Sequence, residues 1–337
     1  MTAAGAPRLA YRAELDGLRG VAVLLVFLQH AQLAGFRHAG WVGVTMFFTL
    51  SGYLITSLLL VEDGHTGRIH LGRFYFRRAL RLLPALVVVL LAVGILAVVV
   101  GRDFWAQELA TLLYVSNWAN VAGLEMWYLG HTWSLAIEEQ FYILWPLALV
   151  FVRSTRWRVA MCVIGVIVSV ALRAVLFGPD AAAESRWSHG LDTRGDALLV
   201  GCLLALVRWS APGWVGWIGI LGLAGTLAFL QPTAELAYAG LVIAAASTAL
   251  IMAAGTGATL GPLVALGGIS YGVYLWHFPI IEGTRWLAAT VPGPVLVLGW
   301  FLATLAAAFA SRRLVELPAL RFRNRSFARA ADEAAPS

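Results

Sequence analysis

Residues 84–100 read PALVVVLLAVGILAVVV, a run without a charged side chain. At about 1.5 Å per residue, a helix of this length nearly crosses the ~30 Å hydrocarbon core of a bilayer. Similar runs recur from Val21 to Ala310, and 60% of the 337 side chains are hydrophobic while 12% are charged. Such a chain cannot cover a water-facing surface. The sequence therefore predicts an all-α integral membrane protein.

The apolar runs predict a bundle of about ten transmembrane helices. We read the first run as a span and not as a secretion signal, because many others follow it. The stretch 106–121 carries Gln107, Glu108, Asn117 and Asn120, so we expect an interfacial or re-entrant helix on the outer face. Cys162 and Cys202 lie within apolar runs and predict neither a disulfide nor a metal site. The predicted spans are 19–36, 41–61, 84–100, 132–152, 159–177, 194–209, 213–230, 236–254, 263–281 and 295–311.

All 24 basic residues are Arg, and they cluster between the apolar runs. With ten spans and both termini in the cytoplasm, most of them fall on the cytoplasmic face, as the positive-inside rule requires. This distribution accounts for the net charge of +6 without a nucleic-acid partner. We expect residues 1–320 to form the membrane domain of a multi-pass protein of the inner (plasma) membrane. Residues 321–337 are expected to be a basic, disordered cytoplasmic tail.

Ionisable residues inside spans are costly, so each one needs a partner or a function. The sequence places six of them at a similar depth in the outer half of the membrane, where we expect them to neutralise one another around a wet pocket. An ion-pair network that only holds helices together is the alternative for any one of them. The six residues are His30, Glu138, Glu139, Arg173, Asp196 and His277.

A second polar group lies at the cytoplasmic boundary of the first and third predicted spans. It consists of Glu14, Asp16, Arg19, Arg73, Arg77, Arg78 and Arg81. Helical spacing puts Arg81 on one face with Arg77 and Arg78. Such a face suits a polyphosphate, although it also suits a lipid-headgroup anchor. Arg19 and His30 are separated by about 16 Å of helix, so a long thioester donor held at the rim could reach the imidazole.

Seven segments in the same order resemble the membrane acyltransferase-3 family, along nearly the whole chain. They are residues 14–23 (ELDGLRGVAV) followed by His30, residues 43–56 (GVTMFFTLSGYLIT), residues 77–84 (RRALRLLP), residues 132–142 (TWSLAIEEQFY), residues 194–198 (RGDAL), residues 269–279 (ISYGVYLWHFP) and residues 316–318 (ELP). Arg19 and His30 match the family's spacing of Arg, ten residues and His. Thr49 and Tyr53 depart from its common Val and Phe.

The resemblance implies an O-acyltransferase with ten spans, cytoplasmic acyl-CoA as co-substrate and no tightly bound cofactor. It implies His30 as the catalytic imidazole and Arg78 and Arg81 near the donor. The acceptor would be a hydroxyl of a glycan, a lipid-linked sugar, peptidoglycan or a glycosylated metabolite such as a macrolide. The expected acyl group is acetyl or another short chain. Some members carry a further extracytoplasmic domain, and the chain is expected to end before one.

In the expected mechanism, acyl-CoA places its phosphates on the arginines and its arm toward His30. The imidazole then takes the proton of the acceptor hydroxyl or carries the acyl group itself. Glu138 or Glu139 would orient the ring, as a carboxylate does in a catalytic triad. The expected substrate-binding residues are Asp16, Arg19, Arg77, Arg78, Arg81, Arg194, Asp196 and His277.

Two other classes of function fit parts of this pattern. A secondary transporter or flippase also places charged groups at depth, but no paired, Gly/Pro-broken helices occur in matching halves. A partner protein that keeps the fold without chemistry is the second alternative. Acyl transfer by the purified protein, set against transport into vesicles, separates these classes.

Overall fold

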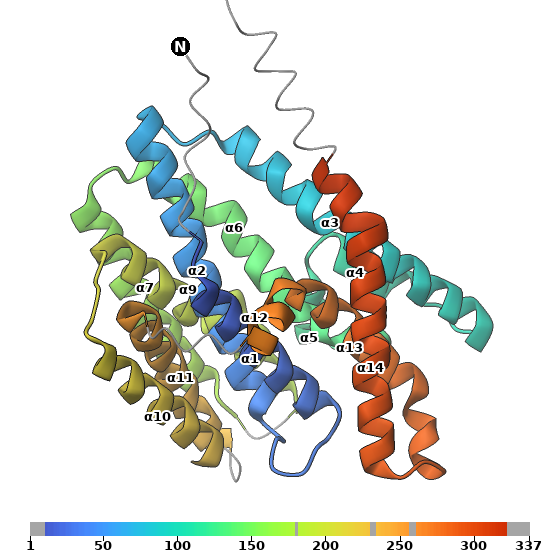
Figure 1. Ribbon diagram of the computed structural model, residues 1–337. Helices are drawn as coiled ribbons and strands as arrows, with labels where there is room; N and C mark the ends of the chain where they lie inside the picture. The colour runs from blue at the N-terminus through green and yellow to red at the C-terminus, as the bar shows by residue number, and fades with distance from the viewer. Residues whose placement is uncertain (1–10, 179–180, 230–233, 256–260, 322–337) are drawn as a thin grey trace, which may run out of the picture.

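The computed structural model describes residues 11–178, 181–229, 234–255 and 261–321. Within these ranges every regular element is helical, and the helices pack side by side (Figure 1). The expected tail lies outside the described residues beyond Arg321. The α-helices are α1 (Ala13–His30), α2 (Ala39–Thr66), α3 (Leu71–Val100), α4 (Trp105–Leu112), α5 (Ser116–Val121), α6 (Trp133–Phe151), α7 (Thr155–Leu176), α8 (Ala181–His189), α9 (Leu191–Val207), α10 (Gly213–Phe229), α11 (Ala234–Ala254), α12 (Gly261–Gly268), α13 (Ser270–Thr284) and α14 (Gly293–Ser311). Short 3₁₀ or π segments are η1 (Trp127–Thr132), η2 (Arg285–Ala289) and η3 (Arg312–Glu316).

Each of the ten predicted spans overlaps a helix, but the count of ten membrane crossings is not confirmed. Five described helices are long and apolar enough to cross a bilayer, or six when one bent pair counts as a span. The others are short or carry charge: α9 has 17 residues and α1 begins with acidic side chains. The molecule is thus a multi-pass membrane protein, while the cytoplasmic location of its termini stays a prediction.

The predicted span 263–281 is wrong as a single helix. It is broken at Ile269 into α12 and α13, whose axes meet at 76°. Gly267 and Gly268 directly precede the break, and glycine weakens a helix by about 0.5–1 kcal/mol relative to alanine. A Cβ at Gly267 would lie 1.8 Å from the backbone carbonyl oxygen of Asp16. Glycine here therefore permits α12 to pack directly on the first turn of α1.

The stretch 106–121 forms two short helices, as its polar side chains require. α4 has 8 residues and α5 has 6, so each extends only about 9–12 Å. Asn117 and Gln140 hydrogen-bond at 2.8 Å and tie α5 to α6. The segment is too interrupted to cross the bilayer as a helix, which agrees with the prediction. The sequence did not predict α8.

Helices α2 and α9 approach each other closely through two reciprocal glycines. A Cβ at Gly52 would lie 1.9 Å from the carbonyl oxygen of Leu198, and one at Gly201 would lie 2.0 Å from that of Thr49. The Sγ atom of Cys202 is 3.4 Å from the Gly52 carbonyl. This contact holds α9 and its charged first turns against the centre of the bundle.

We expect Gly52→Ala to lower the thermal stability of the purified protein. The added methyl group overlaps backbone that cannot move aside, and overpacking of this kind costs about 1–3 kcal/mol. Gly64→Ala is the matched control, because a Cβ added at Gly64, on the same helix, would meet nothing within 4 Å. Thermal unfolding in detergent measures both. Equal midpoints for the two variants would contradict the close approach.

Candidate functional site

His30 ends α1 and faces His277 of α13. Its Nδ1 atom lies 3.0 Å from Nε2 of His277, and the Phe278 ring packs edge-on against it with centroids 4.9 Å apart. His277 is buried, whereas His30 keeps partial exposure. Arg285 donates to the His30 carbonyl at 3.3 Å, placing positive charge at the carboxyl end of α1, where the helix dipole favours it. The His30 ring therefore points at a polar partner inside the protein.

The hydrogen bonds define which nitrogens carry protons when both rings are uncharged. His277 Nδ1 lies 2.6 Å from the carbonyl oxygen of Tyr274, one turn earlier in α13. A carbonyl can only accept, so this nitrogen donates and His277 Nε2 is left as an acceptor. His30 Nδ1 must then donate to His277. The free lone pair of His30 is consequently on Nε2, the state that a general base requires.

His131, in η1, is a third histidine of this group, and the sequence did not predict its place there. Its ring centroid is 5.2 Å from that of His277 and 5.1 Å from that of Phe278. The side chain is 1% exposed, and neither ring nitrogen makes a hydrogen bond within the described residues. Tyr274 donates to its carbonyl at 2.5 Å. The one signal in the sequence was its position immediately before the 132–142 segment.

Glu138 and Glu139 of α6 bind Arg78 of α3 and not the histidines. Arg78 makes a bidentate ion pair with Glu139, and its Nη2 atom lies 3.6 Å from Glu138. Its guanidinium also stacks 3.3 Å above the Tyr142 ring centroid. Glu138 accepts hydrogen bonds from Ser51 at 2.7 Å and from Tyr142 at 2.8 Å. Two carboxylates, one guanidinium and two hydroxyl groups thus form a closed polar network.

The described contacts of Glu138 and Glu139 are with this network, so their expected orienting role toward His30 stays a prediction that these contacts do not support. Glu138 and Glu139 follow His131 by seven and eight residues, which corresponds to about 10–12 Å along a helix. The contact with His277 is made at the His131 end of this segment. His277 occupies the position beside His30 that a carboxylate was expected to fill. A neutral imidazole instead of an acid therefore holds the His30 ring.

The arginines of the basic rim have different surroundings. Arg78 is occupied by the carboxylates, and Arg77 lies 3.9 Å from Glu62. Arg81 is exposed, and the positive charges of Arg19 and Arg78 act on it. The expected single phosphate-binding face of Arg77, Arg78 and Arg81 is thus divided. Arg81, with partly exposed Arg19, remains in a position to meet an anion.

Helix α3 packs against η3, which follows α14. Figure 1 shows the α2–α3 connection and this end of α14 at one end of the bundle. Arg312 and Arg313 of η3 therefore join the basic residues of α3 on the same rim. Asp16 lies in the first turn of α1, with its backbone against Gly267.

Asp196 is also committed to an ion pair. Arg173 of α7 donates to its two carboxylate oxygens at 3.1 Å and 2.8 Å, and both side chains are buried. Arg194, in the same turn of α9, is 1% exposed. The predicted layer of six ionisable residues is therefore three separate sets: the histidines, the Arg78 network and this pair. The expectation that all six neutralise one another is wrong, because Arg78 supplies the charge for the two glutamates.

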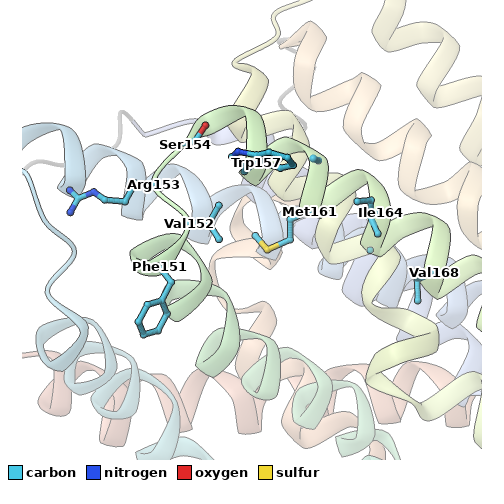
Figure 2. Close-up of a pocket in the computed structure, with 10 residues that line it drawn as sticks. Phe151, Val152, Arg153, Ser154, Trp157, Met161, Ile164 and Val168 are labelled. Carbon is cyan, nitrogen blue, oxygen red and sulfur yellow. The ribbon is translucent and has the colours of Figure 1, made fainter.

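A cavity lies away from these sets, at the turn between α6 and α7 (Figure 2). It has a volume of about 760 Å³ and a mainly apolar lining that includes Phe151, Trp157 and Met161. A neighbouring cavity of about 280 Å³ continues between α6, α7 and α9. Neither is lined by His30 or His277. In the part of the chain that the structure describes, no group of three His, Cys, Asp or Glu side chains is arranged to hold a metal ion.

A multi-pass helical bundle with a hydrogen-bonded histidine pair and a basic rim fits the class of membrane acyltransferases. The family described as "Acyltransferase domain" matches residues 12–313, and the chain belongs to this family. The resemblance to the acyltransferase-3 family is thereby confirmed. No solved structure matches the chain significantly.

Similar proteins are named as O-acetyltransferases. The peptidoglycan O-acetyltransferase OatA of Listeria monocytogenes is 33% identical over 347 residues, covering 91% of this chain and 56% of that protein. A protein of Bacillus subtilis, provisionally named peptidoglycan O-acetyltransferase, is 34% identical over 307 residues, covering 79% of this chain and 48% of that protein. A Staphylococcus aureus protein, provisionally named O-acetyltransferase, is 33% identical over 92% of this chain and 58% of its own length. The chain thus spans about half the length of these relatives.

Proposed function

We propose that the chain is a membrane O-acetyltransferase that transfers an acetyl group from acyl-CoA to a hydroxyl of a cell-envelope carbohydrate. Peptidoglycan is the acceptor that we favour, because two of the similar proteins carry it in their names. The observation that carries the proposal is the hydrogen bond between His30 and His277. It supports a free lone pair on Nε2 of His30, a residue that is partly exposed.

In the proposed reaction, His30 Nε2 accepts the proton of the acceptor hydroxyl as the hydroxyl oxygen attacks the thioester carbonyl carbon. The C–S bond then breaks, and the leaving thiolate takes the proton from His30. The products are an O-acetyl ester and free coenzyme A, and His30 returns to its starting state. His277 is proposed as a positioning residue, because it would act through its hydrogen bond to His30.

Donor binding is proposed at the basic rim, on the cytoplasmic side of the inner membrane. Arg81 and Arg19 would attract the phosphates of acyl-CoA, since Arg78 is already neutralised by carboxylates. The helix between Arg19 and His30 separates the rim from the base by about 16 Å. An extended thioester arm entering the bundle along α1 would bring the acyl carbon toward His30.

The direct test uses the purified full chain in lipid nanodiscs with labelled acetyl-CoA. Soluble peptidoglycan fragments, a lipid-linked sugar and a macrolide serve as separate acceptors. We expect a labelled ester on the peptidoglycan fragments, identified by mass spectrometry. Movement of a solute across vesicles without any ester would instead favour a transporter and overturn the proposal.

We expect Arg81→Ala to raise the KM for acetyl-CoA about tenfold and to leave kcat nearly unchanged. A charge-assisted contact with phosphate contributes about 1.5–3 kcal/mol in binding, and partial exposure reduces this effect. Arg153→Ala is the control, because Arg153 is an exposed arginine of the α6–α7 turn. Initial rates at varied acetyl-CoA measure both. An unchanged KM in the Arg81 variant would mean that this arginine does not bind the donor and serves only to orient the helices in the membrane.

A further inference from the structure

Arg194 has hydrogen-bonding capacity that the described residues do not fill. Its Nη2 atom lies 3.3 Å from the hydroxyl of Thr45, while Nε and Nη1 are buried without a hydrogen-bond partner. The whole residue is 1% exposed. Leaving buried donors unpaired is costly, and the cost is greater for a charged group. This guanidinium therefore differs from Arg78 and Arg173, which both bind carboxylates.

Among the described residues, the charge of Arg194 is also uncompensated by a direct ion pair. Asp196, two residues farther along α9, binds Arg173 through both oxygens. Burial lowers the pKa of His189, at the end of α8, to about 4, so this imidazole is neutral at pH 7. Counted over the described residues, Arg173, Arg194 and Asp196 contribute two guanidiniums and one carboxylate, which is a net charge of +1.

Aromatic rings surround this positive charge. The guanidinium carbon lies 5.4 Å from the Trp41 ring centroid and 5.8 Å from that of Trp133. Trp187 stacks on Trp41 at 5.3 Å, and His189 packs edge-on against Trp133 at 4.7 Å. Cation–π contacts stabilise the guanidinium but leave its in-plane N–H groups available. The rings also lower the local polarity, which strengthens any charge pair formed there.

The Arg194 site is close to the histidines. Trp133 begins α6 two residues after His131, whose ring contacts His277. Two residues span no more than about 7 Å of chain. Ser134 and Tyr274 hydrogen-bond at 2.6 Å and fix α6 against α13 beside the same group. One substrate molecule could therefore reach both Arg194 and His30.

We propose that Arg194 binds a carboxylate of the acceptor and so selects acidic carbohydrate acceptors. A carboxylate is planar and singly charged, so it matches both the fork of the guanidinium and the net charge of +1. A phosphate dianion would leave negative charge unbalanced among the indole rings. This inference rests on the proposed acetyl transfer and names the substrate class of that site.

The test compares N-acetylmuramic acid with its methyl ester, which has the same hydroxyls but lacks the charge. We expect the wild-type chain to acetylate the free acid with at least about tenfold higher kcat/KM, equivalent to 1.4 kcal/mol. Arg194→Gln should reduce this ratio to about one. Arg186→Gln is the matched control, since Arg186 is already paired with Asp192 at 2.6 Å. A ratio near one in the wild type, or an unchanged ratio in Arg194→Gln, would overturn the carboxylate site.

A binding measurement keeps the test independent of catalysis and of the variant's folding. We expect the free acid, but not the ester, to raise the thermal midpoint of the wild-type protein. If no acceptor is acetylated and this shift occurs, the proposed function fails while the anion site stands. If acetylation occurs and the acid and ester give equal shifts, the anion site fails alone.

Discussion

His30→Ala is expected to lower acetyl transfer by about 10²- to 10⁴-fold, the range that general-base catalysis contributes. The variant loses the Nε2 lone pair that would receive the acceptor proton, and Glu138 and Glu139, which are held by Arg78 in a separate set, do not replace it. Donor binding at Arg81 should persist, because the rim is about 16 Å away along α1. Steady-state transfer and equilibrium acetyl-CoA binding, measured on the same preparation, check the two halves of this expectation.

His65→Ala is the matched control for His30→Ala. His65 lies in the exposed last turn of α2, and its removal should change neither rate nor binding. Thermal unfolding of both variants separates loss of chemistry from loss of fold. Full activity in a folded His30→Ala protein would remove this imidazole from the mechanism.

The role of His30 as base or acyl carrier can be separated in the wild-type protein. Incubation with labelled acetyl-CoA in the absence of acceptor, followed by rapid denaturation, would retain label on the chain if His30 carried the acetyl group. The free Nε2 lone pair set by the hydrogen bonds at His30 and His277 fits either role. The proposed reaction uses it as a base, so we expect no labelled His30 peptide. A labelled peptide containing His30 would replace the single-step reaction by two successive transfers.

His277→Leu is expected to lower kcat by about 100-fold, because His30 Nδ1 then loses its hydrogen-bond acceptor and the ring loses its orientation. His277→Asn should keep much of the activity, since the amide oxygen can accept the same hydrogen bond. The KM for acetyl-CoA should be unchanged in both variants. Initial-rate kinetics with separate kcat and KM values test this pattern.

A merely structural role of His277 predicts a different result. Packing alone would make the apolar Leu variant the more stable and more active of the two, because the site is buried beside Phe278 and Tyr274. Equal kcat values for the Leu and Asn variants would also contradict the positioning of His30 by its hydrogen bond to His277. The thermal midpoint of each variant completes the comparison.

The sequence predicted much of the secondary structure because helix formation in lipid follows from local composition. Apolar runs without charge must satisfy their backbone groups internally, and this rule holds at each run independently. Each of the ten predicted spans therefore overlaps a helix, and the polar stretch 106–121 forms two short helices that are not long enough to span a membrane. The break at Ile269 escaped prediction because it depends on how closely α12 packs against α1, which residue composition does not encode.

The sequence also identified most of the chemically important residues, since ionisable side chains are rare within apolar runs. It could not assign their partners. From its position in the third predicted span, Arg78 was expected at the cytoplasmic rim. Its long side chain instead extends from α3 to Glu138 and Glu139 of α6. His131 lies in a short 3₁₀ segment, so no periodicity linked it to His277.

By itself, the sequence determined a helical membrane protein, its family and the presence of His30, because hydropathy and motif order are local properties. Only the tertiary structure decided that His277 hydrogen-bonds to His30, that Arg78 contacts both glutamates and that Arg194 keeps donors without a partner among the described residues. Those outcomes depend on which helix faces approach within about 3 Å, the distance at which hydrogen bonds form. That approach is set by close contacts such as Gly52 against Leu198 and Gly267 against Asp16, between residues far apart in the chain.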